Sequence, residues 1–208
     1  MELEYENVIL AGDSVCQVVR IGPKVWVGTM PVTQRTWSAV AGTSPSHFSG
    51  PDLPVESVSW LDAVWFCELA TKTARMAGSS INGVIRLPFD SERAVYAADP
   101  VLKSDAFIND SERGRFSARH RAHCDEIGWF RANSGGRTHA VGEKPRNSHG
   151  VFDAYGNVWE WLCEVTGDFR TYLGGSWRSR YGDALLRCYT YSGYKSDDIG
   201  FRFAVEFR

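Results

Sequence analysis

The chain has 208 residues, of which 43% are hydrophobic and 23% are charged, as is usual for a folded globular protein. Its formal net charge is −2, so no overall positive field attracts it to nucleic acid or to an acidic membrane surface. No apolar run reaches the roughly 20 residues that span a bilayer, which excludes a predicted membrane span.

The N-terminal segment MELEYENVIL is acidic and lacks the basic start and apolar centre of a signal peptide. No signal peptide is therefore predicted, and we expect a cytoplasmic protein. The five cysteines are odd in number, widely spaced and without a CxxC pair, which favours small buried thiols over a disulfide framework or a zinc site.

Capping signals predict two clear helices. In VTQRTWSAVAG, Thr33 can cap the N-terminus and Gly42 can end the helix. In SVSWLDAVWFCELATKTARMAG, Ser59 and Asp62 have nearly the spacing of a capping box, and we expect Gly78 to end the helix.

A third, shorter helix is predicted in FDSERAVYAAD, with Asp90 as its cap. Short strands are predicted in VCQVVRIG, KVWVGTM, GVIRLP and FRFAVEFR. The last of these alternates large apolar residues with polar or small ones, as a half-buried strand does. We expect this terminal strand to pair with an early one and to bring the two chain ends together.

Residues 100–150 are polar and glycine-rich, with little periodicity. A loop of this length must pack on the core, and we expect it to do so through Trp129 and Phe130. Since no internal repeat or linker interrupts the chain, we expect one domain over residues 1–208.

The cluster HRAHC lies within this polar region. On a helix, His120, His123 and Cys124 would converge and could hold a transition metal. However, the segment is rich in arginine and lies between Gly114 and Gly128, which favours an exposed polar loop.

Several segments together resemble the formylglycine-generating-enzyme (sulfatase-modifying factor) family. They occur in the family's order and are MPVTQRTWSAVAG, SPSHFSGPDLPVESVSWLDAVWFCELA, RLPFDSERAVYAA, NSGGRTHAVGEKPRNSHGVFDAYGNVWEW and GGSW…DDIGFRF. GNVWEW with GGSW and GFR is a specific combination. The resemblance implies an irregular, loop-rich α+β fold of the C-type-lectin type, with small antiparallel sheets and two to three helices. That fold hosts oxidases, iron enzymes and hypervariable binding proteins, including the variable proteins of diversity-generating retroelements, so it does not define one function.

The oxidases of this family resemble one another in a pair of cysteines, three and eight positions after the serine of the GGS motif. Two soft thiolates there select Cu(I). The matching residues here are Ser179 and Ala184, and Cys188 is the nearest thiol. The resemblance therefore implies that this oxidase chemistry is lost. No copper is expected, and no iron either, because the iron enzymes draw their histidines largely from an additional helical domain.

The resemblance also implies a structural calcium ion around GNVWEW. Its ligands would be the side chain of Asp153, the carbonyls of Gly156 and Val158, and the carboxylate of Glu160. In the alternative interpretation, Asp153 caps the turn and Glu160 forms an ion pair with an arginine such as Arg202.

The segment between GGSW and IGFRF is rich in tyrosine and arginine, the residue types that binding surfaces favour. The resemblance places this segment on the ligand-binding face of the fold. The residues that we predict to contact a ligand are Arg178, Ser179, Arg180, Tyr181, Asp183, Tyr189, Tyr191, Tyr194 and Lys195. The alternative is a solvated loop whose tyrosines are half-buried against the rest of the fold.

The leading hypothesis is a non-catalytic module that binds a protein or another macromolecule through residues 178–195. A variable protein of a diversity-generating retroelement and a phage receptor-binding protein, which would be virion-associated, both agree with it. The alternatives are a family oxidoreductase acting on a peptide or small molecule, and a structural subunit of a larger assembly.

Overall fold

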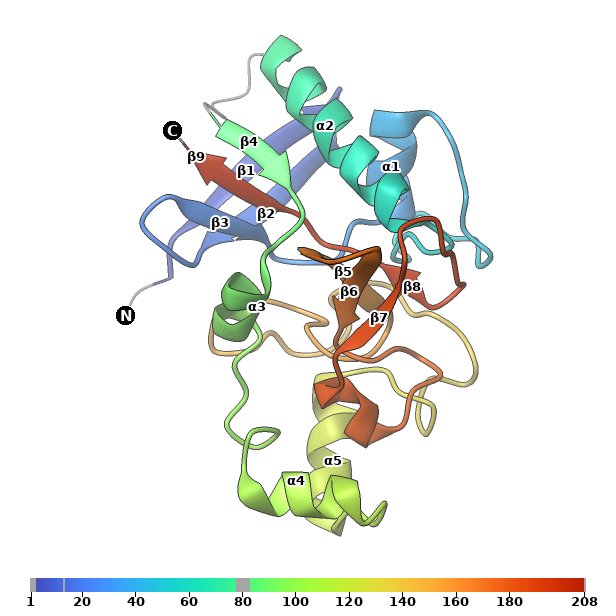
Figure 1. The fold of residues 1–208 in the computed structure, drawn as a ribbon. Coiled ribbons are helices and arrows are strands. Elements are labelled where there is room, and N and C mark those ends of the chain that lie inside the picture. The colour runs from blue at the N-terminus through green and yellow to red at the C-terminus, as the bar shows by residue number, and fades with distance from the viewer. Residues whose placement is uncertain (1–2, 13, 78–82, 208) are drawn as a thin grey trace.

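A computed structural model describes residues 3–12, 14–77 and 83–207 (Figure 1). The helices and strands follow in the order β1 (Tyr5–Ala11), β2 (Ser14–Arg20), β3 (Val25–Gly28), α1 (Gln34–Ala41), α2 (Trp60–Met76), β4 (Gly83–Arg86), α3 (Asp90–Tyr96), α4 (Asp105–Glu112), α5 (Ala118–Ile127), β5 (Trp159–Thr166), β6 (Phe169–Leu173), the 3₁₀-helix η1 (Tyr181–Leu185), β7 (Cys188–Tyr191), β8 (Ile199–Gly200) and β9 (Ala204–Phe207). No helix in the described part of the chain is both long enough and apolar enough to cross a membrane.

Local capping forms the first two helices as the sequence predicts. The Thr33 side chain accepts a hydrogen bond from the first turn of α1, and Gly42 ends this helix with a φ of 69°. At α2, Ser59 and Asp62 form a complete capping box. Gly78, the predicted end of α2, lies outside the described residues.

Helix α3 begins one residue earlier than predicted. Asp90 is its first residue rather than its cap, and Phe89 occupies the cap position. The backbone N–H of Phe89 donates to the carboxylate of Glu92 at 2.8 Å, so the acidic residue of the first turn performs the capping.

A five-stranded antiparallel sheet has the order β1-β2-β3-β9-β4, and helices α1 and α2 lie against one face of it (Figure 1). The predicted pairing of the last strand with an early one is confirmed, because Val205 lies opposite Trp26 of β3 and Ile85 of β4. Within β9, Val205 is buried and the next residue, Glu206, is exposed. Arg202, which lies just before β9, and Ala204 are as buried as their apolar neighbours Phe201 and Phe203.

A second, four-stranded sheet has the order β7-β6-β5-β8, with β8 parallel to β5 and the other pairs antiparallel. The GNVWEW motif leads directly into β5. Trp161 of this strand is completely buried and donates from its indole to the carbonyl of Val58, which belongs to the same hydrophobic cluster. Strand β7 is an edge of the sheet.

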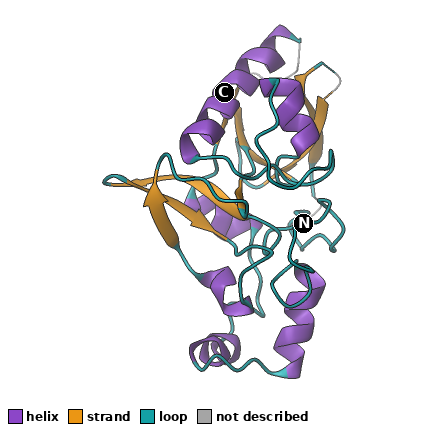
Figure 2. Ribbon diagram, turned by 90° about the vertical axis from the view of Figure 1, so that its right-hand side faces the viewer, coloured by secondary structure: helices purple, strands orange, loops and turns teal. Residues whose placement is uncertain are grey.

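Helices α4 and α5 lie in the segment predicted to be a polar loop, and the expected number of two to three helices is too low. The described part of the chain contains five α-helices, and HRAHC lies in α5. Figures 1 and 2 show α4 and α5 at the end of the molecule opposite to α1 and α2. These two helices are held by few buried side chains, chiefly Phe107, His120 and Cys124.

The two histidines of α5 do not converge on a metal. His120 Nδ1 lies 2.7 Å from Asp110 of α4, whereas His123 Nε2 lies 2.9 Å from Asp99 of the preceding loop. Each imidazole thus interacts with a different carboxylate. Both interactions hold α5 against the residues that precede it in the chain. Phe130 is buried in the neighbouring core, as predicted, whereas Trp129 is half-buried.

Candidate ligand-binding cleft

The GGSW turn is held by hydrogen bonds to the two residues just before β8 and by a bond of its own. Ser176 donates from its hydroxyl to Asp198 at 2.8 Å, and its backbone N–H donates to the hydroxyl of Ser179 at 2.9 Å. The indole of Trp177 donates to the carbonyl of Asp197 at 3.1 Å. These bonds pair the polar groups of the turn and hold its backbone in one conformation. The turn therefore determines the position of the segment that follows it.

The first wall of a cleft is formed by η1, which follows this turn. The N–H of Arg180 donates to the carboxylate of Asp183 at 2.7 Å and closes the first turn of η1. Tyr181 is buried, and its hydroxyl donates to Asp125 of α5 at 2.8 Å. Burial and, after it, this hydrogen bond raise the pKa of Tyr181, so the phenol stays protonated and serves as a donor.

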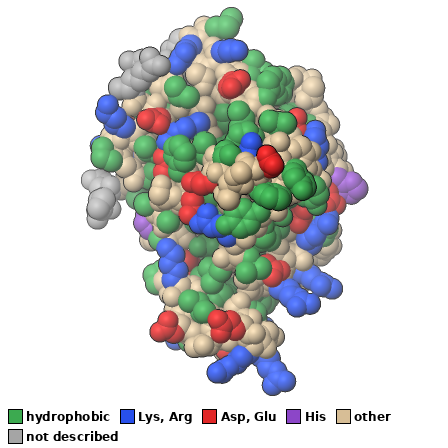
Figure 3. Space-filling view, viewed as in Figure 1, with side chains coloured by type: hydrophobic (Ala, Val, Ile, Leu, Met, Phe, Trp, Pro, Cys, Tyr) green, Lys and Arg blue, Asp and Glu red, His purple; other side chains and the backbone are tan. Residues whose placement is uncertain are grey.

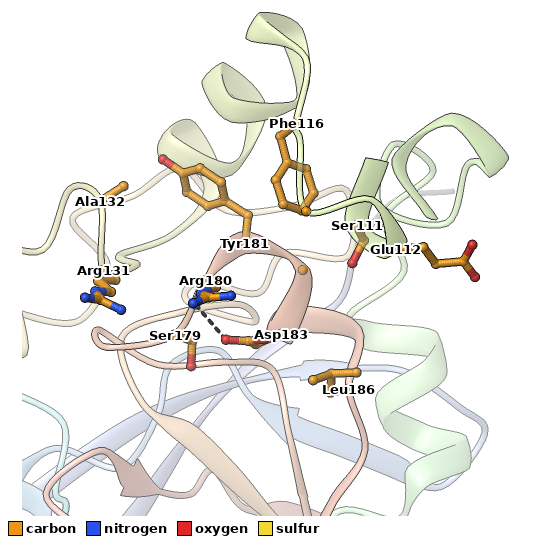
Figure 4. A pocket seen from close by; sticks show the side chains of 12 residues that line it. Ser111, Glu112, Phe116, Arg131, Ala132, Ser179, Arg180, Tyr181, Asp183 and Leu186 are labelled. Atoms are coloured by element: carbon orange, nitrogen blue, oxygen red, sulfur yellow. Dashed lines mark hydrogen bonds between the residues drawn. The ribbon is translucent and has the colours of Figure 1, made fainter. Parts of the chain in front are cut away.

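The second wall comes from α4, the residues between α4 and α5, and the loop after α5. Phe116 stands edge-on to Tyr181, with 5.8 Å between the ring centroids. Between the two walls lies a cleft of about 770 Å³ (Figure 4). Its lining residues are Ser111, Glu112, Gly114, Phe116, Arg131, Ala132, Ser179, Arg180, Tyr181, Gly182, Asp183 and Leu186.

Two of the charged side chains that line the cleft have no ion-pair partner among the described residues. Arg131 and Arg180 are exposed, and neither guanidinium makes an ion pair or a hydrogen bond within residues 3–12, 14–77 and 83–207. The backbone N–H of Arg131 donates to the carbonyl of Ser179 at 3.0 Å. The backbone segments that carry Arg131 and Arg180 are therefore neighbours. In Figure 4, the side chain of Glu112 lies across the cleft from them and points away. The cleft therefore presents two cations without counterions.

The nine residues predicted to contact a ligand fall into three groups. Ser179, Arg180, Tyr181 and Asp183 line the cleft, although Ser179 and Tyr181 are mostly buried. Arg178 pairs with Asp197, and Lys195 pairs with Asp62 at 2.7 Å. Tyr189, Tyr191 and Tyr194 lie outside the cleft.

These three tyrosines lie at the edge of the second sheet and the turn that follows it. Tyr191 is 64% exposed, and its ring lies 5.0 Å from that of Phe169 on the neighbouring strand. Tyr189 and Tyr194 are about half exposed. Figure 3 shows hydrophobic side chains gathered on the face that carries β6 and β7. We call Phe169, Tyr189, Tyr191 and Tyr194 the aromatic patch.

The wall that the α4–α5 segment provides was not predicted from the sequence. Phe116 and Arg131 are separated from η1 by about 50 residues or more, and no local pattern marks them as partners of that segment. The available signal was a serine before each helix. Ser104 and Ser117 each accept a hydrogen bond from the first helical turn, and both precede segments free of glycine and proline.

The positions that match the family's cysteine pair hold no thiol. Ser179 is buried and hydrogen-bonded within the turn, and Ala184 is a buried residue of η1. Cys188 is partly buried, and burial raises the pKa of its thiol. In the described ranges 3–12, 14–77 and 83–207, no three or more His, Cys, Asp and Glu side chains are grouped so that they could hold a metal ion.

The residues expected around calcium do not fit the ion as a set. Glu160 is buried, and Nη2 of Arg202 lies 2.6 Å from one of its carboxylate oxygens. Arg93 and the hydroxyl of Tyr96 also donate to Glu160. A carboxylate between two guanidinium groups has its charge neutralised, and those groups would repel a divalent cation. The geometry of Glu160 agrees with the alternative ion pair.

Asp153 lies next to this network. One of its oxygens accepts from the N–H of Gly142 at 2.7 Å, whereas the other is buried without a hydrogen-bond partner. Burial raises the pKa of Asp153 to about 6. Gly156 and Val158 are both buried close by in the chain, but without Glu160 only one carboxylate of the expected set remains available.

We therefore expect calcium to contribute nothing to stability. Dialysis against EDTA, followed by addition of excess CaCl₂, should leave the melting temperature unchanged within about 1 °C, because an ion that binds only the folded state would raise it in proportion to ln[Ca²⁺]. Differential scanning fluorimetry checks this, with MgCl₂ as the control for ionic strength. A rise specific to CaCl₂ would contradict the ion-pair interpretation of Glu160.

The two sheets, the long irregular connections and the helices at either end together form a C-type-lectin-like α+β fold. The solved structure of Treponema denticola variable protein 1 superposes on it with a TM-score of 0.77 and 21% sequence identity, covering 97% of this chain and 99% of that one. PvdO from Pseudomonas aeruginosa superposes with a TM-score of 0.69 and 16% identity, covering 99% and 92%.

Residues 2–207 match the model of the sulfatase-modifying factor enzyme 1-like domain, and the chain belongs to this family. A relative, the chaperone protein LppX of Paenibacillus barcinonensis, is 26% identical over 77% of this chain and 72% of its own length. The inactive C-alpha-formylglycine-generating enzyme 2 of Bos taurus is 25% identical over 84% of this chain, which spans 58% of that protein.

Proposed function

We propose that the protein is a binding module that takes a segment of another protein into the cleft between η1 and the α4–α5 segment. The observation that carries this proposal is the cleft itself. Its volume of about 770 Å³ falls within the range of roughly 300–1,000 Å³ typical of ligand sites. Leu186, an aliphatic side chain that is 52% exposed, lies at its wall and could bury apolar surface of a partner.

The residues at the family's cysteine positions support binding rather than copper-dependent oxidation. A hydroxyl at Ser179 and a methyl group at Ala184 offer no soft ligand to Cu(I). The relative from Bos taurus carries the word "inactive" in its name, and the similar fold from Treponema denticola is named a variable protein. Both names agree with a family member that has kept the fold for recognition.

We further infer that the aromatic patch extends the binding surface beyond the cleft. Tyr191 and Phe169 are exposed and in mutual contact, and a tyrosine offers a large contact area at a small cost in side-chain entropy. Whether residues 178–195 are diversified is a separate hypothesis about the gene. A nearby imperfect copy of that segment, differing at adenines, would support a retroelement variable protein.

Selection of a phage-displayed random heptapeptide library on the immobilised protein tests the proposal. Peptides selected on the wild type should bind at least about tenfold more weakly to Ala132→Trp, because the indole would occupy the cleft that Ala132 lines. Binding is measured by fluorescence anisotropy with labelled peptides. The same titration on Tyr189→Ala/Tyr191→Ala shows whether the aromatic patch adds to the contact.

The matched control is Ala122→Trp, which adds the same group to an exposed position of α5 outside the cleft. This variant should bind the peptides as the wild type does, and both variants should melt near the wild-type temperature. If no selected peptide distinguishes the two variants, the cleft is not the binding site and the proposed function is wrong.

A further inference from the structure

Arg180 differs from the other three cations of residues 178–195, which all form ion pairs. Arg178 pairs with Asp197, Arg187 with Asp90 and Lys195 with Asp62. Arg131 and Arg180 have no such partner in the described residues, although both line the same cavity. A guanidinium offers five donors in a planar fork that matches a carboxylate, so two of them on adjacent backbone form a receptor for an anionic group.

The acidic residues that share the cleft leave this receptor free. The carboxylate of Asp183 accepts from the backbone N–H of Arg180 at 2.7 Å and is thereby held at the start of η1. Glu112 is exposed on α4, and in Figure 4 it points away from the arginines. Neither carboxylate makes an ion pair with Arg131 or Arg180, so both guanidinium groups are available to a ligand.

The remainder of the cleft is suited to an apolar side chain. Phe116 is partly exposed and Leu186 is largely exposed at its walls, and Gly182 lies close to the Phe116 ring. A polyanion such as nucleic acid needs an extended row of cations, whereas this cleft holds two and the chain has a formal net charge of −2. A short peptide with one acidic and one apolar side chain fits this combination.

We propose that the cleft recognises an acidic peptide segment, in which Arg131 and Arg180 bind a side-chain carboxylate while Phe116 and Leu186 contact a neighbouring apolar side chain. This inference rests on the proposed function, because it names the ligand class of the same cleft. It assigns the two arginines to specificity, since an amide of the same shape would leave both guanidinium charges without a counterion.

The heptapeptides selected on the wild type are synthesised with both termini blocked, so that any carboxylate belongs to a side chain. Each acidic residue is replaced in turn by its amide, Glu by Gln and Asp by Asn. We expect one such replacement in each cleft-binding peptide to weaken binding at least about tenfold. The Arg131→Gln/Arg180→Gln variant should bind the acidic peptide as weakly as the wild type binds the amide peptide.

The control variant is Arg119→Gln/Arg137→Gln, which removes two exposed arginines outside the cleft and changes the net charge equally. It should bind the acidic peptide within about twofold of the wild type at 0.15 M salt, where distant charges are largely screened. Thermal melting of both variants verifies that they fold. An equal loss in both would mean that a general field attracts the peptide, which would overturn the inference.

Two further outcomes separate the inference from the proposed function. If peptides lose binding to Ala132→Trp but tolerate every amide replacement, the cleft binds peptides without reading a carboxylate, and the inference alone is overturned. If inorganic phosphate or a single-stranded oligonucleotide displaces the acidic peptide at a lower concentration than the unlabelled peptide does, the arginines serve a phosphate ligand and the inference is wrong. If no peptide depends on the cleft, both proposals are rejected.

Discussion

Replacing Arg202 with methionine is expected to lower the free energy of unfolding by about 3–5 kcal/mol, as removal of one partner from a buried ion pair usually does. Arg202 is fully buried and donates to Glu160 from both Nε and Nη2. It also donates to the carbonyls of Gly28 at 3.0 Å and Phe152 at 2.8 Å. Methionine would leave a buried carboxylate with only its weaker donors and these carbonyls without partners.

Urea denaturation followed by tryptophan fluorescence measures this loss, since several of the eight tryptophans are buried. Arg35→Met is the matched control, because the pair between Arg35 and Asp52 is exposed on both sides. The control should change the free energy of unfolding by less than about 1 kcal/mol. Similar losses in the two variants would show that the buried network does not have the stabilising role assigned to it.

Replacing Gly156 with alanine should destabilise the fold by more than about 3 kcal/mol. Two costs combine there. The residue has a φ of +74°, which costs an L-residue roughly 1–2 kcal/mol, and an added Cβ would lie 2.6 Å from the carbonyl oxygen of Trp129. That second cost is a clash with backbone, which cannot be relieved by rotating a side chain.

Gly136→Ala separates the cost of the left-handed backbone from the cost of the steric clash. Gly136 has a φ of +80°, but no atom lies within 4 Å of the position that its Cβ would take. Its replacement should cost only the roughly 1–2 kcal/mol of the left-handed backbone. The difference between the two variants in chemical denaturation therefore measures the close approach at Trp129. Equal losses would refute that interpretation.

The elements with strong local signals were predictable from sequence. Thr33, Ser59 and Asp62 determine where α1 and α2 begin through hydrogen bonds within one turn of chain. The strands β2, β3, β4 and β9 were recognised by their apolar residues. The burial of Arg202 was not predicted, because an arginine is usually a surface residue and only the distant Glu160 makes its burial tolerable.

Other elements carry little signal of their own. Helix α4 buries Phe107 and helix α5 buries chiefly His120 and Cys124, so neither shows an apolar stripe. The first half of β5 is buried on both faces, so it lacks the alternation that marks a strand. Strand β1 also escaped prediction, since only two of its seven residues are buried.

Only the part of the candidate site that lies in residues 178–195 could be predicted from the sequence. A composition rich in arginine and tyrosine indicated the 178–195 segment, and four of the nine residues predicted there line the cleft. Composition could not show that Arg178 and Lys195 form ion pairs while Arg180 forms none with the residues that the structure describes. That distinction depends on where Asp197 and Asp62 lie in the fold.

The position of β9 has a consequence for how the polypeptide assembles. Strands β3 and β4 meet only through β9, which occupies residues 204–207, so the first sheet stays open until that stretch has emerged from the ribosome. Until then the nascent chain exposes two unpaired strand edges, a condition that favours aggregation. Folding must therefore follow synthesis of this stretch, and chains cut short before it should depend on chaperones or be degraded.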